Sequence, residues 1–391
     1  MPKFNYSEFI KKNNLPNKGE KIVVAMSGGV DSSLAAVLLF KAGYEVIGVT
    51  MKLHSSKKNI NKSKTCCSGV DIADAKSIAK KFGFKHFIID YEDQFRNSVI
   101  DNFIESYLKG ETPIPCIRCN QTVKFTDLIQ FTQSIGSNVL VTGHYVRREF
   151  NKDEYSIYQA IDKTKDQSYF LFATTSNQLK FLRFPLGDFT KETVRKLATK
   201  FGLTNATKPD SQDICFIPDG NYKKFINKNV KNSIKKGNIE NTEGKIIGQH
   251  NGIINYTVGQ RRGIGIGGIS GIKNKEPLYV IKIDKFKNTV IVGPKKNLAK
   301  YKIFLKNINL IKNSKSNEFN AQIKVRSGVK KVNAKIMLIG EDSGVVELSK
   351  PEFGVSPGQA CVFYEKKKMI GGGWIVAGEK TNSISNTLMN L

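Results

Sequence analysis

Six cysteines are the residues of this chain best suited to chemistry, and two of them, Cys116 and Cys119, form a Cys-x-x-Cys pair. Prolines at 113 and 115 favour an extended loop before the pair. We expect Asn120 to be the N-cap of the helix that follows, which would put Cys119 at the positive end of the helix dipole. That environment favours thiolate and hence nucleophilic chemistry.

Cys215 lies far along the chain, between polar turn residues and apolar ones, as in a loop that delivers a side chain into a site. Several interpretations of the cysteines stay open, namely buried packing, a zinc site, a redox dithiol and sulfur transfer. A closed zinc site needs four ligands, and the chain has a single Cys-x-x-Cys pair. We expect Cys66, Cys67 and Cys361 to be structural, with Cys361 in a core.

A second stretch with functional composition runs from Ala25 to Ser33. An apolar run precedes it and a helical pattern follows, so we expect a strand, a tight turn and a helix. Gly28 and Gly29 let successive backbone N–H groups point at an anion at the helix N-terminus. The patterns of the common nucleotide loop and of the dinucleotide fold are both absent. A plain serine-capped turn is the alternative.

The elements that position these residues alternate between strand and helix up to about residue 145. We expect strands at 22–25, 46–51, 86–90 and 139–142, and helices at 31–42, 71–82, 94–108 and 121–135. Short apolar strands separated by amphipathic helices predict an α/β fold with a doubly wound parallel sheet. Ligands of such sheets bind at the carboxyl ends of the strands, where the glycine turn, Met51, Gly143 and His144 would lie.

Helical patterns become rare after residue 218, and short alternating strands recur from about residue 302. Regular strand spacing with turn residues between the strands predicts a small β-barrel or sandwich. We therefore divide the chain into a catalytic domain at 1–220, a small central domain at 221–298, a C-terminal β-barrel at 299–378 and a disordered tail at 379–391.

The chain carries a formal net charge of +28, from 62 Lys and Arg against 34 Asp and Glu. Such an excess attracts polyanions, and nucleic acid is the usual one, although heavy use of Lys, Asn and Ile is also what biased genome composition would give. No apolar run reaches membrane-spanning length and the N-terminal residues lack a signal core. We expect a cytoplasmic protein without a membrane partner.

The turn Ser27-Gly28-Gly29-Val30-Asp31-Ser32 resembles the pyrophosphate loop of ATP pyrophosphatases, a superfamily that includes tRNA sulfurtransferases and several synthetases. From about Lys21 to Trp374 the chain is similar to the bacterial tRNA-specific 2-thiouridylases within it. The similarity rests on blocks in one order: 27–33, Met51, Cys66-Cys67-Ser68, 113–125, 142–145, 165–171, 211–216, 256–263 and 356–360. That family has an adenine nucleotide α-hydrolase-like catalytic domain, a small central domain and a C-terminal β-barrel.

The resemblance implies that ATP and Mg²⁺ activate the C2 oxygen of the wobble uridine in tRNAs for Lys, Glu and Gln. Sulfur from a persulfide on Cys215 then replaces that oxygen, with Cys119 as the catalytic nucleophile. The implied ATP contacts are Ala25, Met26, Ser27, Gly28, Gly29, Val30, Asp31, Ser32, Met51 and Gly143. The implied contacts with the target base and the anticodon region are Ile114, Pro115, Cys116, His144, Lys165, Asp166, Gln167, Arg326, Ser327 and Gln359. A cysteine desulfurase or sulfur-relay protein would donate the sulfur.

One residue departs from the family pattern, because Cys116 stands where better-known members carry an Asp with an acid/base role. A thiol does not take up a proton in the same way at neutral pH. Cys116, Cys119 and Cys215 could instead hold an iron–sulfur cluster, which is a second hypothesis for sulfur delivery. Other classes that share parts of the pattern are 4-thiouridine synthetases, ATP-dependent amide-forming synthetases and a non-catalytic RNA-binding barrel.

Overall fold

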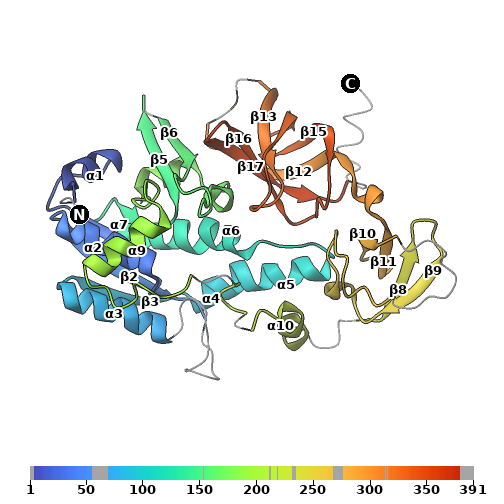
Figure 1. Ribbon diagram of the computed structural model, residues 1–391, viewed down its shortest axis with the longest axis horizontal. Helices are drawn as coiled ribbons and strands as arrows, with labels where there is room; N and C mark the ends of the chain where they lie inside the picture. Colours follow the sequence, from blue (N-terminus) through green and yellow to red (C-terminus); the bar gives the residue numbers. More distant parts are fainter. Residues whose placement is uncertain are drawn as a thin grey trace.

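The computed structural model describes residues 4–54, 69–152, 154–210, 213–217, 219–230, 235–266, 276–312, 314 and 316–378. Cys66, Cys67 and the expected tail at 379–391 lie outside these residues. The molecule is elongated, with an α/β part at one end and a barrel and a small sheet at the other (Figure 1).

The N-terminal part is built on a parallel five-stranded sheet with the order β3-β2-β1-β4-β7. Its strands are β1 (Lys21–Ala25), β2 (Glu45–Lys52), β3 (Lys85–Asp90), β4 (Leu140–Val141) and β7 (Leu182–Arg183). The four strands expected from the apolar runs are all present. The fifth, β7, has only two residues, too few for a sequence pattern to reveal.

Helices cover both faces of this sheet, as the alternation along β1 requires. Ile22 and Val24 point to one cluster of buried residues, whereas Val23 between them points to the other. The first cluster is covered by α1 (Tyr6–Lys12), α2 (Val30–Lys41), α3 (Gly69–Phe82) and α9 (Lys191–Lys200). The second is covered by α4 (Glu92–Phe95), η1 (Arg96–Ile100), α5 (Asp101–Leu108) and α7 (Leu128–Ser134). The predicted doubly wound fold is confirmed.

The helix that carries the Cys-x-x-Cys pair begins earlier than predicted. It starts as α6 (Pro115–Cys119), continues as the π-helical turn η2 (Asn120–Asp127) and runs into α7. Asn120 has helical backbone angles, φ −64° and ψ −45°, so its prediction as an N-cap is wrong. Pro115 suits the start of the helix because N–H groups in the first turn have no carbonyl partner within the helix, so the N–H that proline lacks costs no hydrogen bond.

Six strands of the C-terminal part close into a barrel, because β12 pairs with both β15 and β17. They are β12 (Lys300–Leu310), β13 (Glu318–Lys324), β14 (Val332–Ile339), β15 (Ser343–Glu352), β16 (Ala360–Glu365) and β17 (Lys368–Val376). Their inward side chains form a separate core that includes Ile323, Val346 and Phe363. Cys361 is fully buried in it, which confirms its structural interpretation.

A hairpin from the N-terminal part extends the barrel sheet, which the sequence did not predict. Its strands are β5 (Val146–Asn151) and β6 (Glu154–Gln159), and β6 pairs with β17 at Tyr158–Lys368 and Ile157–Met369. Ile157 is fully buried in the same cluster as Met369. The barrel is thus fixed to the α/β part by strand pairing as well as by side-chain packing.

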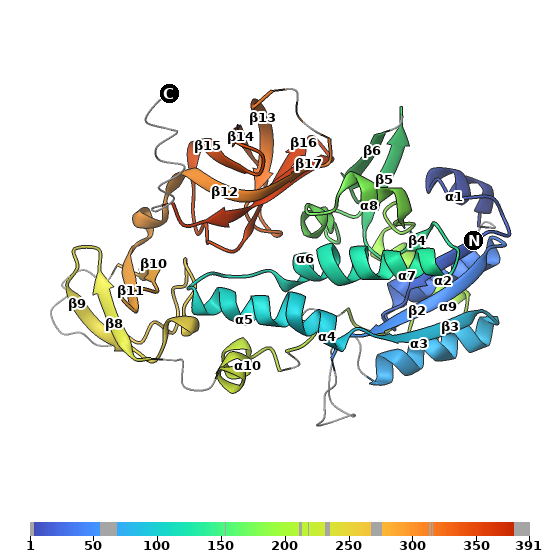
Figure 2. The ribbon, with the colours of Figure 1, turned by 180° about the vertical axis from the view of Figure 1, so that it is seen from behind.

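The central part is a small sheet with the order β10-β11-β8-β9 (Figure 2). Its strands are β8 (Gly237–Asn241), β9 (Ile246–His250), β10 (Leu278–Asp284) and β11 (Thr289–Pro294). The remaining helices are η3 (Ser168–Leu171), α8 (Ser176–Phe181), α10 (Tyr222–Asn229), η4 (Ile253–Asn255) and η5 (Lys295–Leu298). Tyr222 of α10 stacks on Tyr107 of α5, with ring centroids 4.7 Å apart. Among the described residues, no helix combines the length and apolarity that crossing a membrane requires.

Phe172 joins the α/β part to the barrel, and its loss is expected to destabilise the protein. It is fully buried, with its ring centroid 5.4 Å from that of Trp374 in β17. We expect Phe172→Ala to lower the free energy of unfolding by about 3–5 kcal/mol. Phe286→Ala, at a position 88% exposed, is the control and should change it by less than about 0.5 kcal/mol. Equal effects in denaturant unfolding would show that Phe172 does not hold the two parts together.

Candidate active site

The glycine-rich turn lies where β1 ends and α2 begins, at the carboxyl edge of the sheet. The amide of Met26 donates to the carbonyl of Val49 at 2.8 Å, and the hydroxyl of Thr50 donates to the carbonyl of Met26 at 2.7 Å. These bonds to β2 fix the start of the turn. Ser32 is also tied to it, since its Oγ accepts from the amide of Ser27 at 3.1 Å.

The turn has the geometry of an anion site. Gly28 has φ +74°, in the left-handed region, and Gly29 precedes the first residue of α2. Amides in the first turn of a helix have no carbonyl partner within that helix, and the helix dipole favours negative charge there. Ser27 is exposed beside them. The turn can therefore bind a phosphate through backbone N–H groups and a serine hydroxyl.

Gly143 and Met51 lie on the same edge of the sheet; Gly143 is half-buried and Met51 is buried. A Cβ on Gly143 would lie 2.8 Å from the amide nitrogen of Ser32, so only glycine lets the end of β4 pack against α2. Met51 is 8% exposed and belongs to the core cluster. The expected contacts of both residues with ATP remain predictions.

Asp31, within the turn, is held by a buried lysine that the sequence analysis missed. The ammonium of Lys191 lies 2.8 Å from both carboxylate oxygens of Asp31, and the hydroxyl of Tyr145 donates to Asp31 at 2.7 Å. Lys191 is only 8% exposed. In the sequence, Lys191 follows the N-cap Thr190 and resembles any lysine in a first helical turn, so nothing distinguished it.

The cysteines differ in exposure. Cys116 is exposed, Cys119 is buried and Cys215 is half-buried. Cys119 belongs to a hydrophobic cluster against which Cys215 packs. Phe216, the neighbour of Cys215, lies in the same cluster, with its ring centroid 5.2 Å from that of Phe103. The fold thus brings two distant segments of the chain to one cluster.

The iron–sulfur hypothesis does not fit the three cysteines. Within the part of the chain that the structure describes, no group of three or more His, Cys, Asp or Glu side chains is arranged to hold a metal ion. Cys116, Cys119 and Cys215 all lie in that part. Such a cluster would need three converging thiolates, and the structure does not arrange these three side chains in that way.

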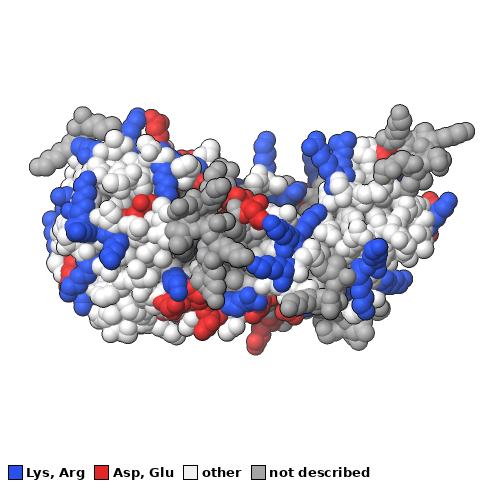
Figure 3. Space-filling view, turned by 90° about the horizontal axis from the view of Figure 1, so that it is seen from below, with Lys and Arg blue, Asp and Glu red and all other residues white. Residues whose placement is uncertain are grey.

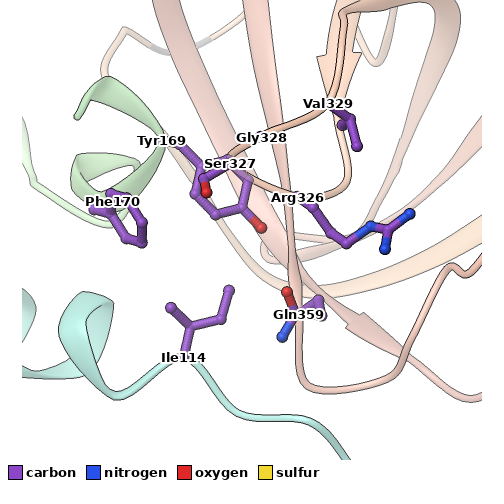
Figure 4. A pocket seen from close by; sticks show the side chains of 8 residues that line it. All are labelled: Ile114, Tyr169, Phe170, Arg326, Ser327, Gly328, Val329 and Gln359. Atoms are coloured by element: carbon purple, nitrogen blue, oxygen red, sulfur yellow. The ribbon is translucent and has the colours of Figure 1, made fainter. Parts of the chain in front are cut away.

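Four residues expected to contact tRNA line one cavity of about 490 Å³ between the barrel and the loop before α6. They are Ile114, Arg326, Ser327 and Gln359, and the remaining lining residues are Tyr169, Phe170, Gly328 and Val329. Figure 4 shows Phe170 on one side of the cavity and Arg326 on the other, with Ile114 and Gln359 below. The ring of Phe170 could stack on a flat ring in the cavity, while the guanidinium of Arg326 and the amide of Gln359 could bind the polar edges of that ring. The sequence analysis did not single out Phe170 for this cavity.

The cavity depends on a join between the barrel and the loop before α6. The side chain of Gln359 donates to the carbonyl of Thr112 at 2.7 Å, and the amide of Thr112 donates to the carbonyl of Pro357 at 2.7 Å. The hydroxyls of Thr112 and Ser356 lie 3.0 Å apart. Gln359 therefore positions the loop that leads to Ile114 as well as lining the cavity.

The Lys165-Asp166-Gln167 motif is already bonded within the chain. Asp166 accepts from the side chain of Gln159 at 2.8 Å, and Gln167 accepts from the amide of Tyr145 at 2.8 Å. Lys165 forms an ion pair with Asp210 at 2.7 Å, and its side chain is 37% exposed. Of the three, Lys165 keeps an exposed charge that a phosphate could reach. Their expected contacts with tRNA remain predictions.

His144 lies outside the residues that line the cavity. Its Nδ1 is 2.7 Å from the hydroxyl of Thr142, and its ring contacts those of Phe125 and Phe184. Burial, followed by the charge of Lys124, lowers the pKa of His144 to about 3. The imidazole is therefore neutral at physiological pH.

Acid sensitivity should follow from His144. Below about pH 6.5, His144 is protonated in the unfolded chain, whereas in the folded chain it stays neutral down to about pH 3. The folded state therefore loses stability as the pH falls through that range. Between about pH 7 and about pH 5, we expect the free energy of unfolding to fall by about 1–2 kcal/mol less in His144→Gln than in the unmodified protein. Denaturant unfolding at the two pH values measures this, and equal losses would contradict it.

The chain matches three family models in succession. These are a tRNA methyl transferase HUP domain at residues 20–219, a tRNA methyl transferase PRC-barrel domain at 223–294 and an aminomethyltransferase β-barrel domain at 300–375. With the fold and the glycine turn, these matches place the chain in a class of tRNA-modifying proteins that have an α/β domain and a C-terminal barrel.

Curated relatives match over nearly the whole chain. The tRNA-specific 2-thiouridylase MnmA of Rickettsia massiliae is 50% identical over 93% of this chain and 98% of its own length, and that of Wolbachia pipientis is 51% identical over 94% and 98%. This chain belongs to the tRNA-specific 2-thiouridylase family. Among solved structures, a 4-thiouridine synthetase–RNA complex with bound ATP is 16% identical, with a TM-score of 0.32 over 54% of this chain and 50% of that one.

Proposed function

We propose that this protein is a tRNA-uridine 2-sulfurtransferase, which replaces the C2 oxygen of the wobble uridine by sulfur at the expense of ATP. The observation that carries the proposal is the 50% identity with 2-thiouridylases over 93% of the chain. The glycine turn, the two cysteines on one hydrophobic cluster and the cavity at Ile114 each supply a part that this reaction needs. The substrates would be tRNAs for Lys, Glu and Gln.

The first half-reaction activates the uridine oxygen. The C2 oxygen attacks the α-phosphate of ATP and pyrophosphate leaves, stabilised by the amides at the start of α2. Mg²⁺ bound through the phosphates would neutralise further charge. The proposed ATP contacts are Ala25 to Ser32, Met51 and Gly143. This step converts the C2 oxygen, which is a poor leaving group by itself, into a good one that departs as AMP.

The second half-reaction delivers sulfur. The outer sulfur of a persulfide on Cys215 attacks C2, and AMP departs with the oxygen. The thiolate of Cys119 then attacks the sulfur of Cys215, which breaks the bond to the transferred sulfur, releases 2-thiouridine and leaves a Cys119–Cys215 disulfide. A thiol reductant from outside the protein restores both cysteines. A cysteine desulfurase or a sulfur-relay protein would reload Cys215.

The tRNA would be held through its backbone and its everted base. We assign the base to the cavity at Ile114, Arg326 and Gln359, because RNA bases outside a helix are commonly bound by stacking and polar edges. Lys and Arg side chains are spread over both ends of the face shown in Figure 3, which suits binding to phosphates. The other proposed contacts are Pro115, Cys116, His144, Lys165, Asp166, Gln167 and Ser327.

The division of the chain follows the same proposal. We propose a catalytic domain at 1–220, a central domain at 221–298 and a barrel at 299–378, acting together on tRNA in the cytoplasm. Cys116, exposed on the first turn of α6, would face the target base without acting as a general base, and water would carry the proton.

The proposal is tested by incubating the full chain with unmodified tRNA, ATP, Mg²⁺, a persulfide donor and a thiol reductant, and analysing the nucleosides by mass spectrometry. We expect uridine to be converted to a species heavier by the difference between sulfur and oxygen, only when ATP is present. Release of AMP without any sulfur in the tRNA would contradict the proposal.

A further inference from the structure

The segment that ends at Asp210, shortly before Cys215, is bonded to the glycine turn at residues 27–32, the proposed nucleotide turn. The side-chain amide of Asn205 donates to the carbonyl of Gly28 at 2.9 Å and to the hydroxyl of Ser33 at 3.0 Å. Asn205 is 4% exposed, so these bonds are shielded from water. The path of the chain toward Cys215 is therefore set beside the turn.

Lys208 adds a second attachment. Its ammonium lies 2.7 Å from a carboxylate oxygen of Asp71 and 2.6 Å from one of Asp74, both on α3. The backbone of Asp71 also lies directly against Gly28, where a Cβ would come within 2.2 Å of its carbonyl oxygen. The turn, α3 and the segment before Cys215 thus form one packed unit.

Asp210 is the last side chain of this unit and has three cationic neighbours. One carboxylate oxygen lies 2.7 Å from the ammonium of Lys191 and 3.4 Å from the guanidinium of Arg195. The other oxygen lies 2.7 Å from the ammonium of Lys165. Burial raises the pKa of Asp210, but hydrogen bonds from Lys165 and Lys191 more than offset this, so its pKa is lowered and it is charged at neutral pH.

The same lysine joins Asp210 to the nucleotide turn. Lys191 holds both oxygens of Asp31 in the turn and one oxygen of Asp210, and it is largely buried. A continuous series of ion pairs therefore runs from Asp31 through Lys191 and Asp210 to Lys165. Its two ends lie at the proposed ATP site and at a proposed tRNA contact, and Cys215 follows Asp210 in the chain.

We propose that Asp210 is a positioning residue that ties the segment carrying Cys215 to the nucleotide turn, so that sulfur is delivered as soon as the uridine has been adenylated. The inference rests on the proposed function and assigns a role to a residue outside its catalytic and binding contacts. Asp210 is not among the proposed contacts with ATP or tRNA. It acts by holding Lys191 and Lys165 at one point from which the chain leads to Cys215.

The consequence is a competition between two fates of the activated uridine. Sulfur attack gives 2-thiouridine and AMP, whereas attack by water gives AMP and returns uridine. If Asp210 loses its charge, Lys191 keeps its ion pair with Asp31 and the turn still binds ATP, but the segment before Cys215 loses the three ion pairs of Asp210, with Lys165, Lys191 and Arg195. Adenylation then continues at its normal rate while sulfur transfer slows, so water hydrolyses a larger fraction of the adenylated uridine.

The test compares AMP formed with 2-thiouridine formed for Asp210→Asn, using the full chain, unmodified tRNA, ATP and a persulfide donor. We expect the ratio of AMP to 2-thiouridine to rise by about tenfold, with the KM for ATP within about twofold of the unmodified protein. Asp219→Asn is the matched control, because Asp219 lies on the other side of Cys215 and its side chain is 53% exposed. It pairs with Lys224 at 3.7 Å and accepts from the amide of Asn221 at 3.1 Å, a bond that an asparagine oxygen can also accept. Its ratio should not change.

Asp210→Glu covers the case in which Asp210→Asn folds poorly, because it keeps the charge. We expect its ratio to lie between those of the unmodified protein and Asp210→Asn. An unchanged ratio in both variants, even if both products fall together, would overturn the inference, because that is the signature of a purely structural role. Absence of 2-thiouridine with the unmodified protein would instead refute the proposed function itself.

Discussion

Cys119→Ser and Cys215→Ser are each expected to reduce formation of 2-thiouridine by on the order of a thousandfold or more while ATP binding is retained. A serine hydroxyl is nearly the size of a thiol, so neither change opens a large cavity at the cluster that both residues contact. A hydroxyl can neither carry a persulfide nor attack one at neutral pH. ATP binding should survive because the glycine turn is held by its hydrogen bonds to Thr50 of β2 and Ser32 of α2, which these variants leave in place.

Cys361→Ala is the control for this pair. Cys361 is also a buried cysteine, but it lies in the barrel core, and burial raises its pKa, so it is unreactive. We expect this variant to lose stability and keep its activity per folded molecule. Nucleoside mass spectrometry and equilibrium dialysis with ATP measure the two quantities. Thiolation that persists in Cys119→Ser would remove the proposed nucleophile from the mechanism.

Gly28→Ala is expected to weaken ATP binding by at least about tenfold, because the new Cβ cannot be accommodated. Gly28 has φ +74°, which costs an L-residue about 1–2 kcal/mol. In addition, the Cβ would lie 2.2 Å from the carbonyl oxygen of Asp71, so the turn or α3 must move. Moving the turn misdirects the amides that would hold the phosphates.

Gly83→Ala is the control that separates the cost of a positive φ from the cost of the steric clash. Gly83 has φ +85°, but no heavy atom lies within 4 Å of a Cβ built there. We expect it to lose about 1 kcal/mol of stability and to bind ATP normally. If both variants bind ATP equally well in isothermal titration, the turn does not form the nucleotide site.

Much of the fold could be predicted from the sequence because buried parallel strands are continuous apolar runs. The strands at 22–25 and 46–51 fell in the expected places, and the structure has short strands after residue 300, as the alternating pattern predicted. The β5–β6 hairpin was missed because its partner, β17, is far away in the sequence. No local pattern records that pairing.

The candidate site was predicted less completely. The glycine turn could be predicted from its run of Ser and Gly residues, and the cysteines from the reactivity of thiols. Lys191 and Asp210 were missed because lysine at a helix start and aspartate in a loop are ordinary in sequence and become unusual only when burial brings them together. The start of α6 was misplaced because both Pro115 and Asn120 suit a helix N-terminus, and only the packing decides between them.

Following the uridine oxygen tests the account most directly. The measurement uses tRNA whose target uridine carries oxygen-18 at C2, together with ATP, a persulfide donor and the full chain, and determines the mass of the AMP formed. We predict that AMP acquires the heavy oxygen in proportion to the 2-thiouridine produced. Unlabelled AMP alongside newly formed 2-thiouridine would contradict activation of this oxygen by ATP.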